Sequence, residues 1–118
     1  MTSSLQDLTQ RLNEFRDERD WTQFHTLKNL LISLNLEAAE LLELSQWKTD
    51  EELEALLDDP TFHKNLTEEA ADVMLYLLMI SEKAGIDLDK AARDKIAINA
   101  AKYPAEKSHG NARKYTEL

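Results

Sequence analysis

Two pairs of carboxylates recur at a spacing of three residues in this sequence: Glu37 with Glu40, and Glu69 with Asp72. Residues three apart in a helix lie on one face, one turn from each other. Both pairs stand in apolar helical stretches. There a carboxylate must be paired, protonated or bound to a metal, because burying a bare charge costs several kcal/mol. The four carboxylates together predict a cation site.

The residue types favour a hard cation at that site. The chain has no cysteine, and the two acidic stretches carry no Glu-x-x-His step of the kind found in di-iron bundles. Oxygen ligands without His or Cys favour Mg²⁺, with Mn²⁺ as a possible substitute, over zinc and copper. Mg²⁺ held by a few carboxylates keeps several waters and accepts phosphate oxygens as further ligands. The pattern therefore indicates phosphate chemistry.

An ordinary interpretation of the same residues stays open at this point. An acidic helical protein produces Glu-x-x-Glu by chance, and we expect the step Glu40–Glu43 to face solvent. The chain would then be a non-catalytic helical interaction module with a structural cation site. Trp21 and Trp47 flank the ends of the first acidic helix, either as core residues or as rings that stack on a base. The ordinary roles of the remaining candidates are a core position for Tyr76, a surface or capping position for His25, and exposed charges for Lys95 and Lys102.

The elements that must position these residues are all predicted to be helices. Two glycines, two prolines and the absence of two-residue alternation indicate an all-α protein. The helical pattern predicts four long helices, and we expect them to form a four-helix bundle with a short extra helix in the second connection. Residues 1–104 form the domain, and residues 105–118 form an extended or flexible tail. The predicted helices span about 5–15, 26–46, 49–57, a long segment that begins between 61 and 67 and ends at 84, and 87–102, with Pro60 closing the turn before the long segment.

Composition excludes several classes of partner. The formal charge of −9 argues against binding a nucleic-acid polymer or an anionic membrane surface, because both require a basic surface. The longest apolar run, residues 73–80, is too short to span a bilayer. We therefore expect a cytoplasmic protein. The same run is apolar around its whole circumference, so we expect this helix to lie near a subunit interface of an oligomer.

The motifs, in order and at their spacing, resemble those of the MazG-like, all-α nucleoside triphosphate pyrophosphohydrolases, and within them the dCTP pyrophosphatase branch. The resemblance spans nearly the whole chain. The matching motifs are Glu18–Trp21 with Phe24-His25, Asn29–Leu31, Glu37-x-x-Glu40, Gln46–Lys48, Glu68-Glu69 to Asp72-Val73, Lys95 with Ile98-Asn99, Lys102–Pro104 and Arg113–Leu118.

The resemblance implies a Mg²⁺-dependent enzyme that cleaves dCTP, or a related or modified pyrimidine deoxynucleoside triphosphate, to the monophosphate and pyrophosphate. It also implies a helical bundle that assembles as a dimer of dimers, a homotetramer. The implied metal ligands are Glu37, Glu40, Glu69 and Asp72, with Glu40 as the catalytic residue that orients the attacking water. The resemblance implies that Lys95 and Lys102 contact the phosphates and that Asn99 contacts the substrate. It implies a base and sugar pocket, partly from a neighbouring subunit, that is formed by Trp21, Trp47 and Tyr76, with His25 as a further pocket candidate.

The sequence departs from the family pattern at three positions. Leu36 precedes Glu37 where many members have a second glutamate, and Ala39 stands where the dCTP branch has glycine. Leu12 occupies the position of a first-helix histidine that dCTP pyrophosphatases can use to bind the base. The resemblance therefore implies the reaction class and leaves the base open, with a phosphoribosyl-ATP pyrophosphohydrolase as the rival within the enzyme class.

Overall fold

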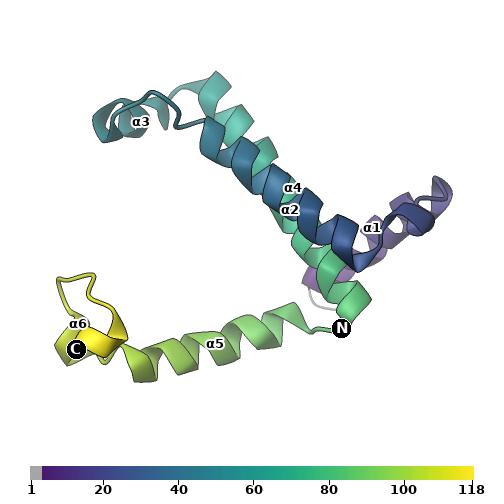
Figure 1. Ribbon diagram of the computed structural model, residues 1–118. Coiled ribbons are helices and arrows are strands. Elements are labelled where there is room, and N and C mark those ends of the chain that lie inside the picture. Colours follow the sequence, from purple (N-terminus) through teal and green to yellow (C-terminus); the bar gives the residue numbers. More distant parts are fainter. Residues whose placement is uncertain (1–3) are drawn as a thin grey trace. The chain divides into compact units, whose positions relative to one another are not determined.

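The computed structural model describes residues 4–118, and in this part of the chain every regular element is helical, with no strand (Figure 1). The prediction of an all-α protein is confirmed. The chain divides into two units, residues 1–85 and residues 86–118. None of the helices within residues 4–118 is long and apolar enough to cross a membrane.

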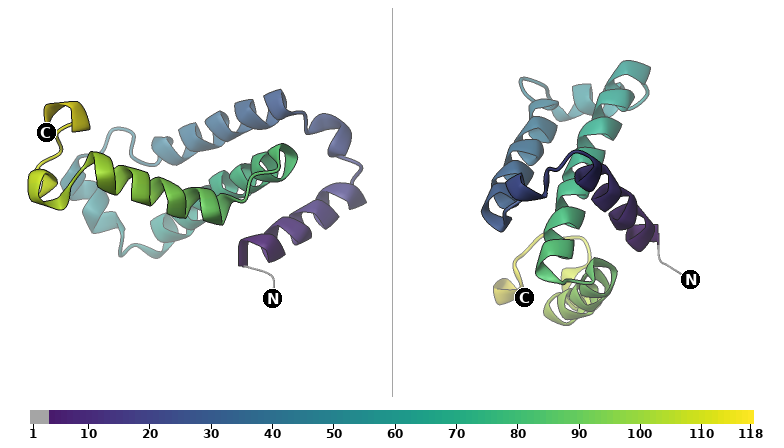
Figure 2. Two further views of the ribbon diagram at one scale, coloured as in Figure 1. Left: turned by 90° about the horizontal axis from the view of Figure 1, so that it is seen from below. Right: turned by 90° about the vertical axis from the view of Figure 1, so that its right-hand side faces the viewer.

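The first unit is built on two long helices that lie side by side. Helix α2 packs along α4, and α1 packs across α4 (Figure 2). The short helix predicted in the second connection is present as α3. The elements of this unit are α1 (Ser4–Glu18), the 3-10 turn η1 (Thr22–Phe24), α2 (Leu27–Glu43), α3 (Asp50–Leu56) and α4 (Pro60–Ala84).

Helix α2 begins where the sequence predicts and ends three residues earlier. The Thr26 side chain accepts a hydrogen bond of 3.1 Å from the backbone N–H of Asn29, which fixes the first turn. The helix ends at Glu43 rather than at residue 46. The Ser45 hydroxyl donates to the Leu42 carbonyl at 2.7 Å, and Trp47 adopts a left-handed backbone with φ of 64°. A side chain that bonds the local backbone competes with the helical ladder, so the prediction of the end was wrong by one turn.

Helix α4 begins at Pro60, one residue before the predicted range. We predicted that this proline closes the preceding turn, and that assignment was wrong, because the fixed φ of proline suits the first helical position, where no N–H is needed. The Asp59 carboxylate accepts from the Phe62 N–H at 2.9 Å and caps the new helix. The predicted end at residue 84 is confirmed, and Gly85 follows with a φ of 69°, a conformation that glycine adopts without strain.

The core of the first unit lies between α2 and α4. Leu30 and Leu78 are the hydrophobic side chains buried within residues 4–118, at 3% and 2% exposure. Ser81 is buried beside them, and its hydroxyl donates to the Leu77 carbonyl at 2.8 Å. Burying a leucine side chain contributes about 1.5–3 kcal/mol, so these contacts fix the register of the two helices.

The second unit consists of α5 (Leu88–Lys102), α6 (Ala105–Ser108) and the 3-10 turn η2 (Tyr115–Glu117). The Asp87 carboxylate accepts from the Lys90 N–H at 3.1 Å and caps α5, which begins where the sequence predicts. No residue of α5 or α6 is buried as a whole. The segment after Pro104 contains two short helical turns, and its separation from a domain of residues 1–104 stays a prediction.

Candidate active site

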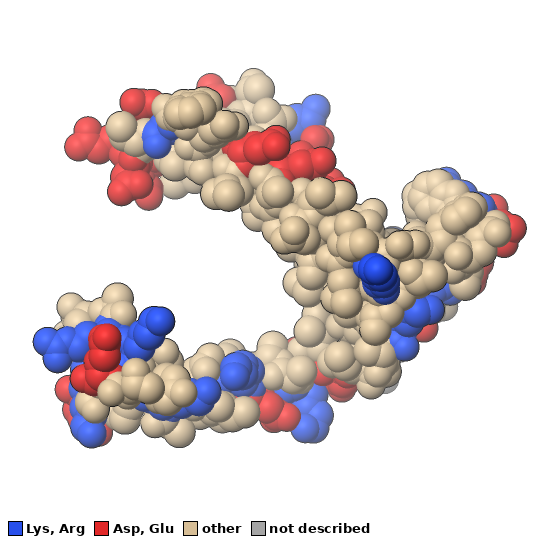
Figure 3. Space-filling model, viewed as in Figure 1, with Lys and Arg blue, Asp and Glu red and all other residues tan. Residues whose placement is uncertain are grey.

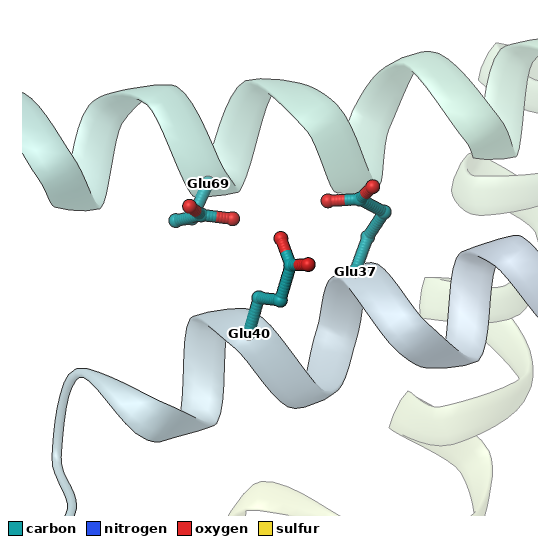
Figure 4. A group of neighbouring side chains, drawn as sticks. All are labelled: Glu37, Glu40 and Glu69. Atoms are coloured by element: carbon teal, nitrogen blue, oxygen red, sulfur yellow. The ribbon is translucent and has the colours of Figure 1, made fainter.

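Three of the predicted carboxylates meet between α2 and α4. Glu37 and Glu40 project from α2 toward Glu69 on α4 (Figure 4). One carboxylate oxygen from each residue lies within 4.8 Å of the other two. The spacing of Glu37 and Glu40 puts both on one face of α2, and the packing of α2 on α4 brings the third side chain opposite them.

Burial and neighbouring negative charges make the ionised forms of Glu37 and Glu69 less favourable than in water. Burial raises the pKa of Glu37 above its usual value, and the nearby charges of Glu40, Asp72 and Glu69 raise it further. Burial also raises the pKa of Glu69, followed by the charge of Glu40. Within the described residues, the Oε2 atoms of Glu37 and Glu69 are buried and have no hydrogen-bond partner. Because unpaired buried carboxylate oxygens are costly, the cluster fits a bound cation.

Asp72, the fourth predicted ligand, lies close to this cluster. Its negative charge raises the pKa of both Glu37 and Glu69. It also lines an adjoining cavity of about 210 Å³. Asp72 therefore stands between the carboxylates and the cavity, and its role as a ligand stays a prediction.

The adjoining cavity is aromatic and contains three of the predicted pocket residues: Trp21, His25 and Tyr76. The Trp21 ring meets the Phe15 ring edge to face, with centroids 5.6 Å apart, and lies 6.4 Å from the His25 ring. Such edge contacts hold the rings in place and leave a flat apolar wall. The cavity can therefore accept a planar ring.

His25 presents an unpartnered polar atom in this region. Its Nδ1 atom is buried and has no hydrogen-bond partner among the described residues. Burial lowers the pKa of His25, and the positive charges of Arg16 and Lys83 lower it further. The imidazole is therefore neutral near pH 7 and can accept or donate one hydrogen bond at Nδ1, according to its tautomer.

Several cavity residues were missed as candidates from the sequence. Phe15 and Arg16 were not among the predicted site residues, yet both line the cavity with Leu12. The available signal was the three-residue spacing from Leu12 to Phe15 on the helix that precedes Trp21. Leu12, which stands at the position of the family histidine, thus faces the same cavity as Trp21.

The remaining predicted residues are not among those that form the carboxylate cluster or line the aromatic cavity. Trp47 follows α2 with 91% of its surface exposed, and it does not line the aromatic cavity. Lys95, Asn99 and Lys102 lie on α5 in the second unit, where all three are exposed. Their spacing of four and three residues places them on one face of that helix. Their contact with substrate stays a prediction.

Comparisons with known proteins agree with the site and the fold. The model of the MazG-like family matches residues 32–118. Human dCTP pyrophosphatase 1 is 43% identical over 115 residues, which are 98% of this chain and 68% of that protein, and its bovine counterpart is 41% identical over the same share. A crystal structure of a pyrophosphatase from Archaeoglobus fulgidus superposes with a TM-score of 0.80 at 38% identity, covering 88% of this chain and 95% of the other. The resemblance found in the motifs is therefore confirmed, and the chain belongs to the MazG-like family.

Proposed function

We propose that this protein is a nucleoside triphosphate pyrophosphohydrolase of the dCTP pyrophosphatase type. It cleaves dCTP, or a related or modified pyrimidine deoxynucleoside triphosphate, to the monophosphate and pyrophosphate. The observation that carries the proposal is the juxtaposition of three convergent carboxylates with an aromatic cavity in one unit. The names of the relatives support the same reaction class.

The carboxylate cluster fits a divalent cation, and we assign it Mg²⁺, with Mn²⁺ as a substitute. Within residues 4–118 the buried Oε2 atoms of Glu37 and Glu69 have no hydrogen-bond partner, as expected of hard-cation ligands. Glu37, Glu40, Glu69 and Asp72 would hold the ion. When bound, Mg²⁺ offsets the charge of the phosphates and polarises the phosphoryl oxygens.

Side chains in and beside the carboxylate cluster have separate proposed roles in catalysis and substrate binding. Glu40 is the exposed member of the three, so its carboxylate meets solvent and can accept a proton from a water that it orients. Trp21 and Tyr76 line the cavity in which a base would stack. Neutral His25 offers a hydrogen bond at Nδ1 to a polar edge of the base. With Leu12 at the cavity wall, the first helix supplies an apolar contact at that point.

We propose further substrate contacts among the exposed residues of the second unit. Lys95 and Lys102 would contact the phosphates as point charges, and Asn99 would donate a hydrogen bond to the substrate. The exposed indole of Trp47 would reach a base or sugar from a neighbouring subunit, since it lies apart from the cavity of its own chain. Residues 1–104 would carry the domain, with residues 105–118 following it.

We also propose that the chain assembles as a homo-oligomer, a dimer of dimers in which the long helices complete four-helix bundles. Large apolar side chains of α2 are exposed, including Leu31 at 50% and Leu42 at 71%. An apolar cavity of about 480 Å³ is lined by α2, α3 and α4 residues such as Leu41 and Phe62. Exposed apolar area of this kind marks an interface. A stable monomer in size-exclusion chromatography with light scattering would contradict the assembly.

The enzymatic proposal is tested with purified protein and a panel of common and modified nucleoside triphosphates that includes phosphoribosyl-ATP. We expect pyrophosphate and monophosphate to form from dCTP or a related pyrimidine with Mg²⁺, and turnover to stop in EDTA. Release of inorganic phosphate in place of pyrophosphate, or equal turnover in EDTA, would contradict the proposal.

The same panel separates the alternative functions. Turnover of phosphoribosyl-ATP alone would favour the rival enzyme. Binding of triphosphate with Mg²⁺, but no pyrophosphate over hours at high protein concentration, would favour a non-catalytic module with a structural cation site.

A further inference from the structure

The second unit carries a different charge balance from the first. Residues 86–118 contain seven Lys and Arg against five Asp and Glu, whereas residues 1–85 contain seven against eighteen. A nucleoside triphosphate is strongly anionic, so it is repelled by the first unit unless cations intervene. The cations of the second unit, which outnumber its carboxylates, are therefore candidates for binding phosphate.

The positive charges of this unit are paired at one end and unpaired at the other. On the first half of α5, Lys90 pairs with Asp94 at 2.7 Å, and Arg93 pairs with Asp89 at 3.0 Å. From Lys95 onward, no Lys or Arg in the described chain forms an ion pair, although Glu106 and Glu117 lie in the same segment. Figure 3 shows Lys and Arg gathered over the end of this unit that carries α6 and the C-terminus.

Tyr115 ties the C-terminal segment to the end of α5. Its ring meets the Tyr103 ring edge to face, with centroids 6.1 Å apart. The Lys102 Nζ lies 4.9 Å from the centre of the Tyr115 ring, in a cation–π contact. The Lys102 ammonium, which we assign to phosphate binding, is therefore held by the tail.

A hydrogen-bonded turn at Gly110 and Asn111 precedes the segment that contains Tyr115. Gly110 has a φ of 75°, and the Asn111 side chain donates to the Lys107 carbonyl at 3.1 Å. The same side chain accepts from the Arg113 N–H at 3.0 Å. Arg113 and Lys114 immediately precede Tyr115, so their Cα atoms lie within about 8 Å of the Tyr115 Cα.

We propose that Arg113 and Lys114, together with Lys102 held by Tyr115, bind the phosphates of the substrate. This inference rests on the proposed function and adds two substrate-binding residues and one positioning residue to it. Arg113 supplies a planar fork that matches two phosphate oxygens, and Lys114 and Lys102 supply compact charges. Tyr115 acts through Lys102, by keeping the ammonium at one place on the face of its ring.

The first test is the double variant Arg113→Gln with Lys114→Gln. We expect KM for dCTP to rise about 10-fold while kcat stays within about 2-fold, because each lost charged contact weakens binding of phosphate. The matched control is Lys28→Gln with Lys64→Gln, which removes two exposed cations of the first unit and should leave KM unchanged.

Binding of inorganic triphosphate with Mg²⁺, measured by calorimetry, tests the phosphate contact without turnover. We expect the double variant to bind about 10-fold more weakly than the control variant. Equal KM and equal affinity would overturn the inference and leave the proposed function intact if the wild-type protein still releases pyrophosphate. If the wild-type protein releases no pyrophosphate from any triphosphate, the proposed function is contradicted. If the wild-type protein also fails to bind inorganic triphosphate, the inference about phosphate binding is overturned too.

The positioning role of Tyr115 is tested with Tyr115→Phe and Tyr115→Ala. Phenylalanine keeps the ring beneath Lys102, so KM should stay within about 2-fold, whereas alanine should raise KM several-fold at unchanged kcat. Circular dichroism checks that both variants fold. If both variants match the wild-type KM, or if alanine lowers kcat alone, the positioning role is wrong.

Discussion

The two units of this chain differ in what holds them together and in the charge that they present. The first unit buries Leu30, Leu78 and Ser81 between its helices and directs carboxylates from α2 and α4 toward one point. The second unit buries no residue of α5 or α6, and its Lys and Arg residues from Lys95 onward form no ion pair within the described residues. One unit is thus a packed anionic scaffold, and the other a cationic surface segment.

The charge of each unit suits a different part of a magnesium nucleotide. A magnesium nucleotide has a cation that seeks carboxylate oxygens and phosphate oxygens that seek Lys and Arg. The first unit suits the cation, and the second suits the phosphates. Variants of the two units should therefore fail in different ways.

The largest expected effect concerns the packed core. Leu78→Ala should lower the free energy of unfolding by about 2–5 kcal/mol, because it removes buried methyl groups and leaves a cavity. Ile98→Ala, at a side chain of α5 that is 48% exposed, should cost less than about 1 kcal/mol. Urea unfolding at one fixed protein concentration measures both. Equal losses would show that the second unit has a core of its own in solution.

The next effect separates the acidic cluster from ordinary surface carboxylates. Glu37→Gln or Glu69→Gln should lower Mg²⁺-dependent pyrophosphate release about 100-fold, because each removes a charged oxygen ligand from the cluster. Glu43→Gln, one turn beyond Glu40 and outside the cluster, is the control and should retain activity. If all three variants behave alike in a steady-state assay, the cluster is not the metal site.

The pH dependence of stability gives a smaller effect of known sign. Folding raises the pKa of Glu37 and Glu69 above the usual 4.5, so the folded protein binds protons more tightly than the unfolded chain. Without metal, these groups therefore lower stability as the pH rises through the window between 4.5 and the raised pKa values, and the loss persists above it. In EDTA, the melting temperature of Glu37→Gln should fall less over this pH window than that of the wild-type protein. Adding Mg²⁺ should reduce this difference between the variant and the wild type. A larger loss in the variant would contradict the repulsion.

The smallest effect concerns the turn after α2. Trp47 has a φ of 64°, which costs a residue with a Cβ about 1 kcal/mol and costs glycine nothing. We expect Trp47→Gly to be about 1 kcal/mol more stable than Trp47→Ala, although both lose the indole and should weaken substrate binding equally. Melting temperatures and KM values of the pair check this. A less stable glycine variant would mean that the left-handed turn is absent in solution.

Local features of the fold could be predicted from the sequence. Thr26, Asp87 and Gly85 mark helix ends because caps depend on hydrogen bonds within four residues or on the backbone freedom of one residue. The failures were also local: Pro60 opens a helix instead of closing a turn, and Ser45 helps to end α2 early. In both places two local roles compete for one residue, and the pattern alone does not rank them.

The sequence by itself determined that this is an all-α protein with two carboxylate pairs, each on one helical face, because helical period and capping act over a single turn. Only the tertiary structure decided that Glu69 meets Glu37 and Glu40 within 4.8 Å, and that Tyr115 lies against Lys102. Contacts between residues about 30 positions apart depend on the register in which α2 and α4 bury Leu30 and Leu78. That register comes from packing, which no local motif encodes.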